Sequence, residues 1–246
     1  MNDLVKSIQE KYLFTLEKIS DAARSVGRDP GSVRLVVVTK AQPVAVARAA
    51  IEAGALYLGE NYPEEGAAKI QTLCEFSAVE WHMIGHVQSR KAQTVAVNFN
   101  CVHSLDSLKL AVRLDRFCGE ANLSMPVLLE FNVGGEESKS GWSAWDEARW
   151  STLVDEISKV IALPNLQVRG LMTMPPLGSA PESSRPYFQR LKRLRDFLAA
   201  QFPLARFDEL SMGTSSDYEV AVQEGATLVR VGTAIVGARQ YKTESV

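Results

Sequence analysis

Cysteine is scarce in this chain, and the few cysteines present do not form a recognisable pattern. Cys74, Cys101 and Cys118 are the only three among 246 residues, and no two of them have a CxxC spacing. An odd number of widely spaced cysteines argues against a disulfide framework and favours free thiols in a reducing compartment. We therefore expect a cytoplasmic protein.

Long apolar runs and clustered charge of one sign are also missing. No run approaches the roughly 20 residues that a membrane span needs. Charges interrupt the first 20 residues every few positions, so the N-terminus has no signal-peptide core. The net charge is -2 and the pI is about 6.0. Nucleic acids and anionic membranes both need clustered positive charge, so neither is an expected partner.

Several catalytic signatures are absent from the sequence as well. It contains no GxSxG motif, no Walker loop and no carboxylate cluster for a metal. His82 and His86 have an HxxxH spacing, but Met83 stands where the HExxH motif has glutamate. The segment is also typical of a strand and a loop rather than a helix, so we expect no zinc site of that type. His103 lies within another strand-like run, where a packed structural role is expected.

The chain does contain a regular alternation of short apolar runs and helical stretches. A leading helix is predicted over 3–26, where apolar residues recur at helical spacing. The first apolar run is β-branched and continuous, which is typical of a strand buried on both faces. The eight strand-like runs are 34–40, 56–61, 80–85, 101–106, 126–133, 167–174, 207–212 and 228–236. Helical stretches between them include 43–54, 107–121, 143–161 and 183–202.

Eight strand–helix units in about 210 residues predict a single (β/α)8 TIM-type barrel with an extra N-terminal helix. A doubly wound open sheet is the alternative, but no GxGxxG motif follows the first strand. No linker, low-complexity tract or change of composition divides the chain. We therefore expect one domain over residues 1–246.

In such a barrel the active site lies at the carboxyl ends of the strands. Lys40 ends the first apolar run. A lysine amine in apolar surroundings has a lowered pKa, and a neutral amine attacks an aldehyde to form an imine. The alternative is a lysine that leaves the strand for solvent.

A hydroxyl- and glycine-rich loop follows the seventh strand, and Gly232-Thr233 lies in the eighth. Loops at these two places form the usual phosphate site of TIM barrels, where glycines allow close approach and hydroxyls donate hydrogen bonds. The alternative for Ser215 and Ser216 is ordinary helix capping.

Arg230 alternates with Val229 and Val231, which places it on the opposite face of the strand. An arginine inside a barrel needs a partner. A pyridine nitrogen is one such partner, and it would remain unprotonated because arginine keeps its own protons. The alternative is an outward arginine paired with a helix carboxylate.

Taken together, these features resemble the pyridoxal phosphate homeostasis protein family, whose fold is similar to the barrel domain of alanine racemase. The resemblance covers residues 36–239 in the family's order. The matching stretches are VVVTK, LGENYPEE, WHMIGHVQSRK, VHSLD, VLLEFNVGGEESKSG, RGLMTMP, LSMGTSSDYEVAVQEGA and VRVGTAIVGAR. The chain departs from the commonest pattern at Ala41-Gln42, Arg90 and Thr214, none of which matches a cofactor contact.

The resemblance implies a binding site for pyridoxal 5'-phosphate (PLP). It implies that Lys40 carries PLP as a Schiff base and that Arg230 faces the pyridine nitrogen. The other positions that match cofactor-binding residues are Asn61 beside the ring, Met172 and Thr173 on a nearby strand, and Ser211, Gly232 and Thr233 around the phosphate.

The resemblance further implies a non-catalytic role in cellular PLP (vitamin B6) and amino-acid homeostasis, with PLP-dependent apoenzymes as recipients. The alternative is a PLP-dependent amino-acid racemase or lyase. A racemase needs a base on each face of the substrate carbon, and active relatives resemble this barrel plus a second domain, which we expect to be absent here. A cofactor-free Schiff-base aldolase is a third reading, but it would not need the phosphate loop or Arg230.

Overall fold

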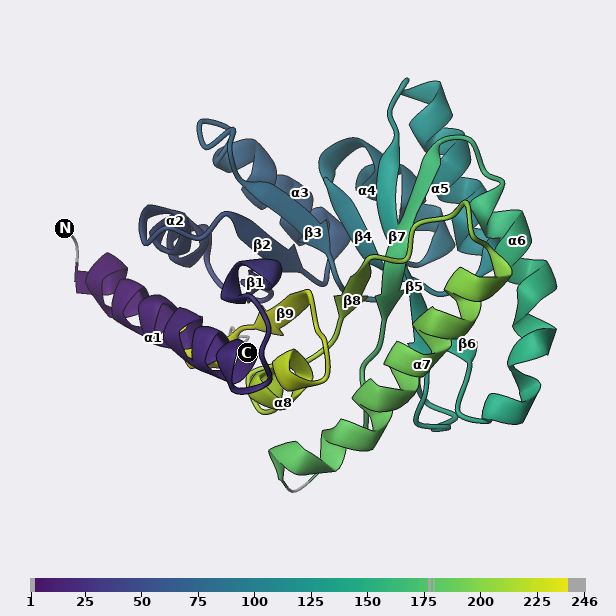
Figure 1. Cartoon of the computed structure of the whole chain (residues 1–246). Coiled ribbons are helices and arrows are strands. Elements are labelled where there is room, and N and C mark those ends of the chain that lie inside the picture. The colour runs from purple at the N-terminus through teal and green to yellow at the C-terminus, as the bar shows by residue number, and fades with distance from the viewer. Residues whose placement is uncertain (1–2, 177, 179, 239–246) are drawn as a thin grey trace, which may run out of the picture.

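Eight of the apolar runs form the strands of a parallel sheet that closes on itself (Figure 1). The computed structural model describes residues 3–176, 178 and 180–238. The barrel strands are β1 (Arg34–Val38), β2 (Tyr57–Glu60), β3 (Glu80–Met83), β4 (Cys101–Leu105), β5 (Met125–Asn132), β7 (Leu166–Met172), β8 (Glu209–Ser211) and β9 (Leu228–Val231). Pairing of β4 with β5 closes the ring. The predicted eight-stranded barrel is therefore confirmed.

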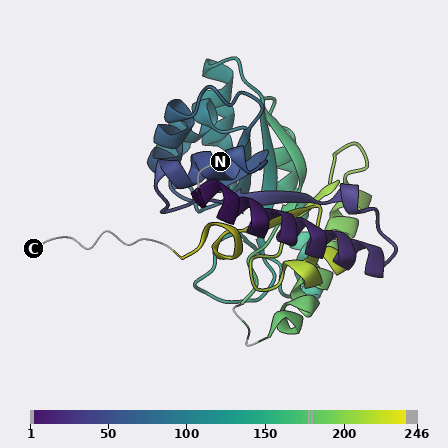
Figure 2. The same ribbon diagram turned by 90° about the vertical axis from the view of Figure 1, so that its left-hand side faces the viewer.

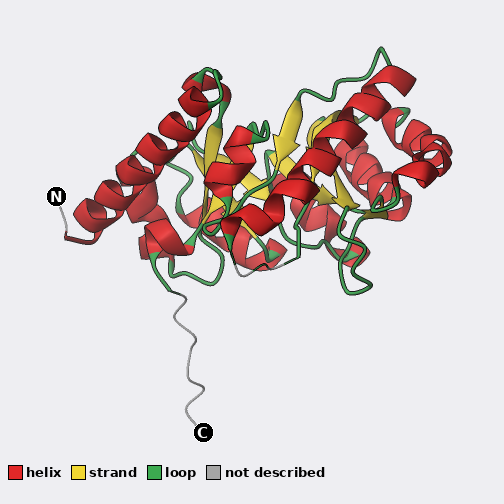
Figure 3. Ribbon diagram, turned by 60° about the horizontal axis from the view of Figure 1, so that its bottom comes forward, coloured by secondary structure: helices red, strands yellow, loops and turns green. Residues whose placement is uncertain are grey.

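Helices surround the strands, as the red ribbons around the yellow arrows show in Figure 3. They are α2 (Val44–Glu52), α3 (Pro63–Thr72), α4 (Ala92–Asn98), α5 (Leu108–Glu120), α6 (Val154–Ile161), α7 (Arg185–Gln201), α8 (Tyr218–Gln223) and α9 (Thr233–Val236). Short 3-10 turns are η1 (Pro30–Ser32), η2 (Ser89–Lys91), η3 (Glu147–Leu153) and η4 (Pro181–Ser184). None of the helices in the described part of the chain is long and apolar enough to cross a membrane.

The N-terminal helix α1 (Asp3–Ser25) completes this outer layer. It packs against α2, α8 and α9, and Figure 2 shows it lying across the face of the barrel that is turned to the viewer. Its buried positions, among them Val5, Ile8 and Ile19, recur at helical spacing. Because α9 has only four residues, α1 covers the part of the ring that a longer last helix would otherwise cover.

The strands are buried on both faces, and alternate residues belong to different cores. Val37 and Val231 pack in the large core between strands and helices, whereas Val36 and Leu228 belong to a smaller cluster within the barrel. Arg230 is the register partner of Val36. Side chains two residues apart share a face of a strand, so Arg230 lies on the inner face with Leu228.

Two expected elements end or begin elsewhere. The strand predicted over 228–236 stops at Val231, because Gly232 turns the chain into α9 and its carbonyl accepts from the Ile235 amide. The helix predicted over 143–161 begins late. Trp142–Ser143 instead forms a short strand, β6, beside β5, and the α-helix starts at Val154 after η3. Trp142 is buried, and its ring packs against Phe131.

Candidate functional site

A cavity of about 480 Å³ opens at the carboxyl ends of the barrel strands. Its size is in the range of small-molecule sites. Five of the eight predicted site residues are among its lining residues: Lys40, Asn61, Arg230, Gly232 and Thr233. The others in the lining are Val38, Ile84, Gly85, His86, Glu130, Met174, Thr214, Ser215 and Ser216. Met172, Thr173 and Ser211 are buried beneath this layer.

The backbone on both sides of Lys40 is fixed by the buried Lys69 and the half-buried Glu65. Lys69 Nζ donates to the Thr39 carbonyl at 2.7 Å, and Glu65 accepts from the Ala41 amide at 2.8 Å. Ala41 has a φ of 55°, in the left-handed region that alanine rarely adopts. Hydrogen bonds on either side of Lys40 therefore hold a strained turn in place at the mouth of the barrel.

Lys69 and the two glutamates that it bonds were not predicted from the sequence. Lys69 Nζ lies 2.8 Å from Glu60 and 2.6 Å from Glu65, and Glu60 also accepts from the Thr39 hydroxyl at 2.6 Å. Burial raises the pKa of Glu60, while the contact with Lys69 opposes that shift. The spacing of Glu65 and Lys69, four residues apart in a helix, was the only available signal, and such pairs are usually solvent-exposed.

Arg230 is buried in the barrel wall and held by acceptors. One terminal nitrogen donates to the Ser211 hydroxyl oxygen, and the other donates to the Thr173 carbonyl at 2.9 Å and lies 2.9 Å from Met174 Sδ. Burial lowers the pKa of Arg230 to about 10, with Glu130 and Asp217 opposing the shift. The guanidinium thus keeps its charge at neutral pH while it faces the cavity.

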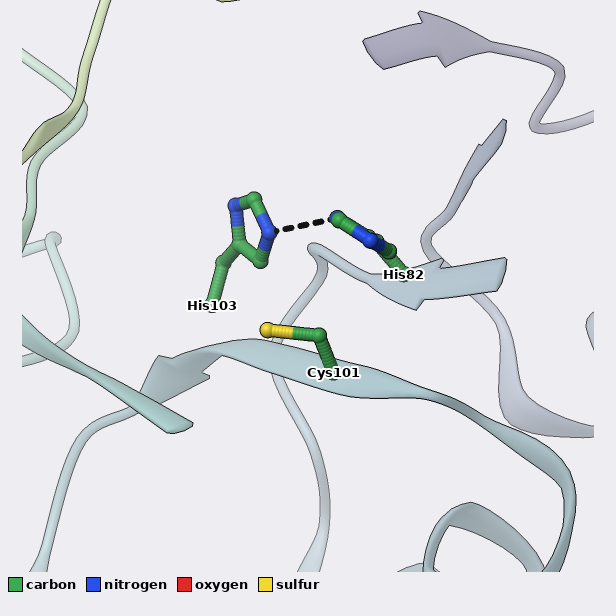
Figure 4. Close-up of side chains that lie close together, drawn as sticks. All are labelled: His82, Cys101 and His103. Atoms are coloured by element: carbon green, nitrogen blue, oxygen red, sulfur yellow. Dashed lines mark hydrogen bonds between the residues drawn. The ribbon is translucent and has the colours of Figure 1, made fainter. Parts of the chain in front are cut away.

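A chain of hydrogen bonds continues from Arg230 through the barrel interior. His103 Nδ1 lies 2.8 Å from Ser211 Oγ, and His103 Nε2 lies 2.9 Å from His82 Nδ1. Figure 4 shows the two imidazole rings with this contact dashed. His82 Nε2 in turn lies 3.4 Å from Glu80 at the start of β3. The chain connects the cavity end of the barrel with its opposite end.

The two ends of this chain fix the position of every proton in it. Burial lowers the pKa of both His82 and His103, so each ring is neutral and carries one N–H. The hydrogen bond from His82 lowers the pKa of Glu80, which therefore accepts. It follows that His82 donates from Nε2, His103 donates from Nε2, and the Ser211 hydroxyl donates to His103. Ser211 then accepts from Arg230, which can only donate.

The loop after β8 presents three hydroxyl groups to the cavity, from Thr214, Ser215 and Ser216. The turn requires Gly213, which has a φ of 90° and where a Cβ would lie 2.5 Å from that of Ala221. Asp217 accepts from the Thr214 amide at 2.7 Å and from its hydroxyl at 3.0 Å. Ser215 Oγ accepts from the Gly232 amide at 3.2 Å. These contacts join the two loops in which a phosphate site was expected.

Ser211, a predicted phosphate ligand, lies below the cavity lining. It is fully buried, and its hydroxyl is engaged by His103 and Arg230 rather than turned to the cavity lining. Ser215 lines the cavity beside Gly232, although helix capping was the alternative role expected for it from the sequence. Thr214 also lines the cavity, although it matched no cofactor contact in the sequence. Met172 is likewise buried, in the inner cluster with Val36.

Two polar atoms of the cavity residues have no hydrogen-bond partner in the described part of the chain, and both are buried. They are Asn61 Oδ1 and Glu130 Oε2. Burial, together with the nearby Asp106, raises the pKa of Glu130 to about 7, while Arg230 opposes the shift. Buried polar atoms normally find partners, so unsatisfied ones in a cavity fit a site that a polar ligand completes. The lining also contains the amine of Lys40, the guanidinium of Arg230 and several hydroxyl-bearing residues. This set of groups suits an anionic ligand that has a carbonyl group.

Comparison with known proteins finds relatives that match nearly the whole chain. The sequence model of the family "Alanine racemase, N-terminal domain" matches residues 16–240. The pyridoxal phosphate homeostasis protein of Vibrio alginolyticus is 41% identical over 240 residues, which cover 96% of this chain and 100% of the relative.

Two solved structures match closely. A structure described as an unknown protein from Bifidobacterium adolescentis has a TM-score of 0.86 at 33% identity, covering 96% of this chain and 97% of that one. PipY of Synechococcus elongatus, solved with PLP bound, has a TM-score of 0.77 at 36% identity, covering 89% of this chain and 100% of that one.

Proposed function

Since the chain belongs to the pyridoxal phosphate homeostasis protein family, we propose that it binds PLP in the 480 Å³ cavity, as a Schiff base on Lys40. The observation that carries this proposal is the meeting of Lys40, Arg230 and Thr233 in one cavity, although they lie far apart in the sequence. The PLP-bound relative has the same barrel at 36% identity, which supports the proposal.

The residues in the cavity divide between the two ends of the ligand. Thr233, Ser215 and Gly232 are our candidates for the phosphate site, because they lie together on the joined loops. Hydroxyl and amide donors near an anion form charge-assisted hydrogen bonds, which are the stronger kind. Asn61, whose amide oxygen has no other partner, would lie beside the ring.

Met172, Thr173 and Ser211 would act from beneath the ligand. The Thr173 carbonyl and the Ser211 hydroxyl orient Arg230, and Met172 packs under the site in the inner core. A residue of this kind affects the cofactor through the position of the arginine. Direct contact of these three residues with PLP remains a prediction.

The proposed role is to hold PLP and supply it within cellular vitamin B6 homeostasis, without significant catalysis. Bound PLP supplies an electron sink for carbanion chemistry. Arg230 weakens that sink, because a ring nitrogen that accepts from a charged guanidinium stays unprotonated. PLP-dependent apoenzymes are the proposed recipients. The cytoplasm is the proposed compartment, on the ground of three free cysteines.

The test compares the visible absorption of the wild-type protein with that of Lys40→Ala after addition of PLP. The wild type should show the absorption of a PLP Schiff base, and Lys40→Ala should not, whereas the surface variant Lys159→Ala should match the wild type. An unchanged spectrum in Lys40→Ala would refute the assignment.

A second measurement separates the carrier from a racemase. Exchange of the alanine α-proton with solvent deuterium, followed by NMR, should be slow in the PLP-loaded wild type. Exchange at the rate of a true racemase would establish the enzymatic alternative.

A further inference from the structure

Three side chains with metal-binding atoms meet inside the barrel, away from the cofactor cavity (Figure 4). His82 comes from β3, and Cys101 and His103 come from β4. His82 and Cys101 are register partners, and His103 lies two residues further along the same strand face. One ligand atom from each residue lies within 4.8 Å of the others. The strand register therefore builds this cluster, although His82 is 19 positions from Cys101 and 21 from His103 in the sequence.

The remaining ring nitrogens lie next to oxygen atoms that can accept from them in a metal site. His82 Nε2 lies 3.4 Å from the Glu80 carboxylate, and His103 Nδ1 lies 2.8 Å from Ser211 Oγ. Histidine ligands of metals almost always donate their second N–H to such oxygen atoms. This leaves His82 Nδ1 and His103 Nε2 facing each other at 2.9 Å, next to the sulfur of Cys101.

A second cavity, of about 310 Å³, gives access to the cluster. His82 and Cys101 both line it, and it lies at the end where the barrel strands begin. The formal charges of its lining residues cancel. Three are arginines, Arg34, Arg169 and Arg206, and three are carboxylates, Glu80, Asp208 and Glu209. A divalent cation would thus meet no net positive charge there, and a water molecule in the cavity has room to complete its coordination.

We propose that His82, Cys101 and His103 form a tetrahedral site for a Zn²⁺-type cation, with water as the fourth ligand. One thiolate and two imidazoles are a ligand set that zinc accepts in proteins, and the water position matches an open site. The cation replaces the thiol proton, which is released. The proton of His103 moves from Nε2 to Nδ1 and is donated to Ser211 Oγ, and the hydroxyl hydrogen of Ser211 rotates away from His103 about the Cβ–Oγ bond.

Cobalt(II) is the direct probe, since its absorption reports both thiolate ligation and geometry. The background variant Cys74→Ser/Cys118→Ala keeps Cys101 as the single thiol of the chain. In this background, Co²⁺ should bind one equivalent with a thiolate-to-metal charge-transfer band and the intense visible bands of tetrahedral Co²⁺. Adding Cys101→Ala should remove the charge-transfer band and weaken Zn²⁺ binding at least tenfold. Charge transfer that survives Cys101→Ala, or its absence from the background variant, would overturn the proposal.

Thermal unfolding gives an independent readout. A cation that binds only the folded state raises Tm. Zn²⁺ should therefore raise the Tm of the background variant and leave that of the added Cys101→Ala variant unchanged, with circular dichroism confirming that both are folded. An equal rise in the two proteins would place the cation elsewhere and contradict the site.

Discussion

At the scale of single residues, two kinds of residue occur at the cofactor cavity. Some line it and would touch the ligand, and others are buried below it and hold the lining residues in place. Thr233 lines the cavity, whereas Ser211 is buried below it and bonded to Arg230. Both were candidates for the phosphate site from the sequence. The structure gives them different expected effects on binding.

The variants Thr233→Val and Ser211→Ala distinguish these two roles. Loss of a charge-assisted bond costs about 1.5–3 kcal/mol, so Thr233→Val should weaken PLP binding by roughly 10- to 100-fold. Its effect on pyridoxal, which lacks the phosphate, should be small. Ser211→Ala should weaken the binding of both ligands by a similar factor, because it acts through Arg230. Equilibrium binding of PLP and pyridoxal measures this, and a loss in Ser211→Ala that is specific for PLP would return Ser211 to the phosphate site.

Glu130 predicts an unusual pH dependence of stability. Its pKa is raised to about 7 from 4.5, mainly by burial. Between these values the native state binds more protons than the unfolded state, so this residue makes the free energy of unfolding fall as pH rises. The full shift corresponds to a loss on the order of 3 kcal/mol.

Glu130→Gln should remove that loss. The free energy of unfolding of the variant should therefore rise relative to that of the wild type as the pH is raised from 5 to 8. Urea unfolding without PLP at the two pH values measures the difference. Glu182→Gln, at an exposed carboxyl whose pKa is lowered by Arg185, serves as the control without this gain. A Glu130→Gln protein whose stability relative to the wild type is the same at both pH values would show that Glu130 is not perturbed.

At the scale of elements, α3 fixes the turn after β1 through Lys69. Removing one partner of a buried ion pair typically costs about 3–5 kcal/mol, and Lys69→Met should lower the free energy of unfolding by that amount. The matched control is Lys159→Met, which removes a pair of the same spacing with Asp155 on the surface. Exposed pairs contribute roughly 0–1 kcal/mol.

Lys69→Met should also weaken PLP binding, because it releases the Thr39 carbonyl beside Lys40. Chemical denaturation and PLP titration of the two variants test both effects. Equal stability losses in Lys69→Met and Lys159→Met would show that the buried network does not hold the turn.

The strands were predictable from sequence because each barrel strand is buried on both faces and appears as a short apolar run. The exceptions have local causes. Residues 233–236 have the composition of a strand, but the turn at Gly232 and the amide contacts that follow it make them helical. The two-residue strand β6 is too short for any periodicity to reveal.

The sequence predicted which residues lie near the carboxyl ends of the strands, and Lys40 and Arg230 both line the cavity there. It was not predictable where the residue acts through a distant partner. Lys69 gave no sign of being buried, and His103 was assigned a packing role because its partners come from β3 and β8. The proximity of His82 to Cys101 depends on strand register, which a single sequence does not reveal.

At the scale of the whole molecule, the barrel is closed by strand pairing and its outer layer is completed by α1. We propose on this ground that the chain forms one domain. Thermal unfolding should then be a single transition, with far-UV circular dichroism and tryptophan fluorescence changing at the same temperature. Two separated transitions would contradict a single domain.

Covalent attachment of PLP to Lys40 is the central claim, and one measurement tests it directly. The PLP-loaded wild-type protein is reduced with borohydride, digested and mapped by mass spectrometry. The account predicts a stable pyridoxyl phosphate group on the peptide that contains Lys40, in near-stoichiometric yield. A label on another lysine, with Lys40 unmodified, would contradict it.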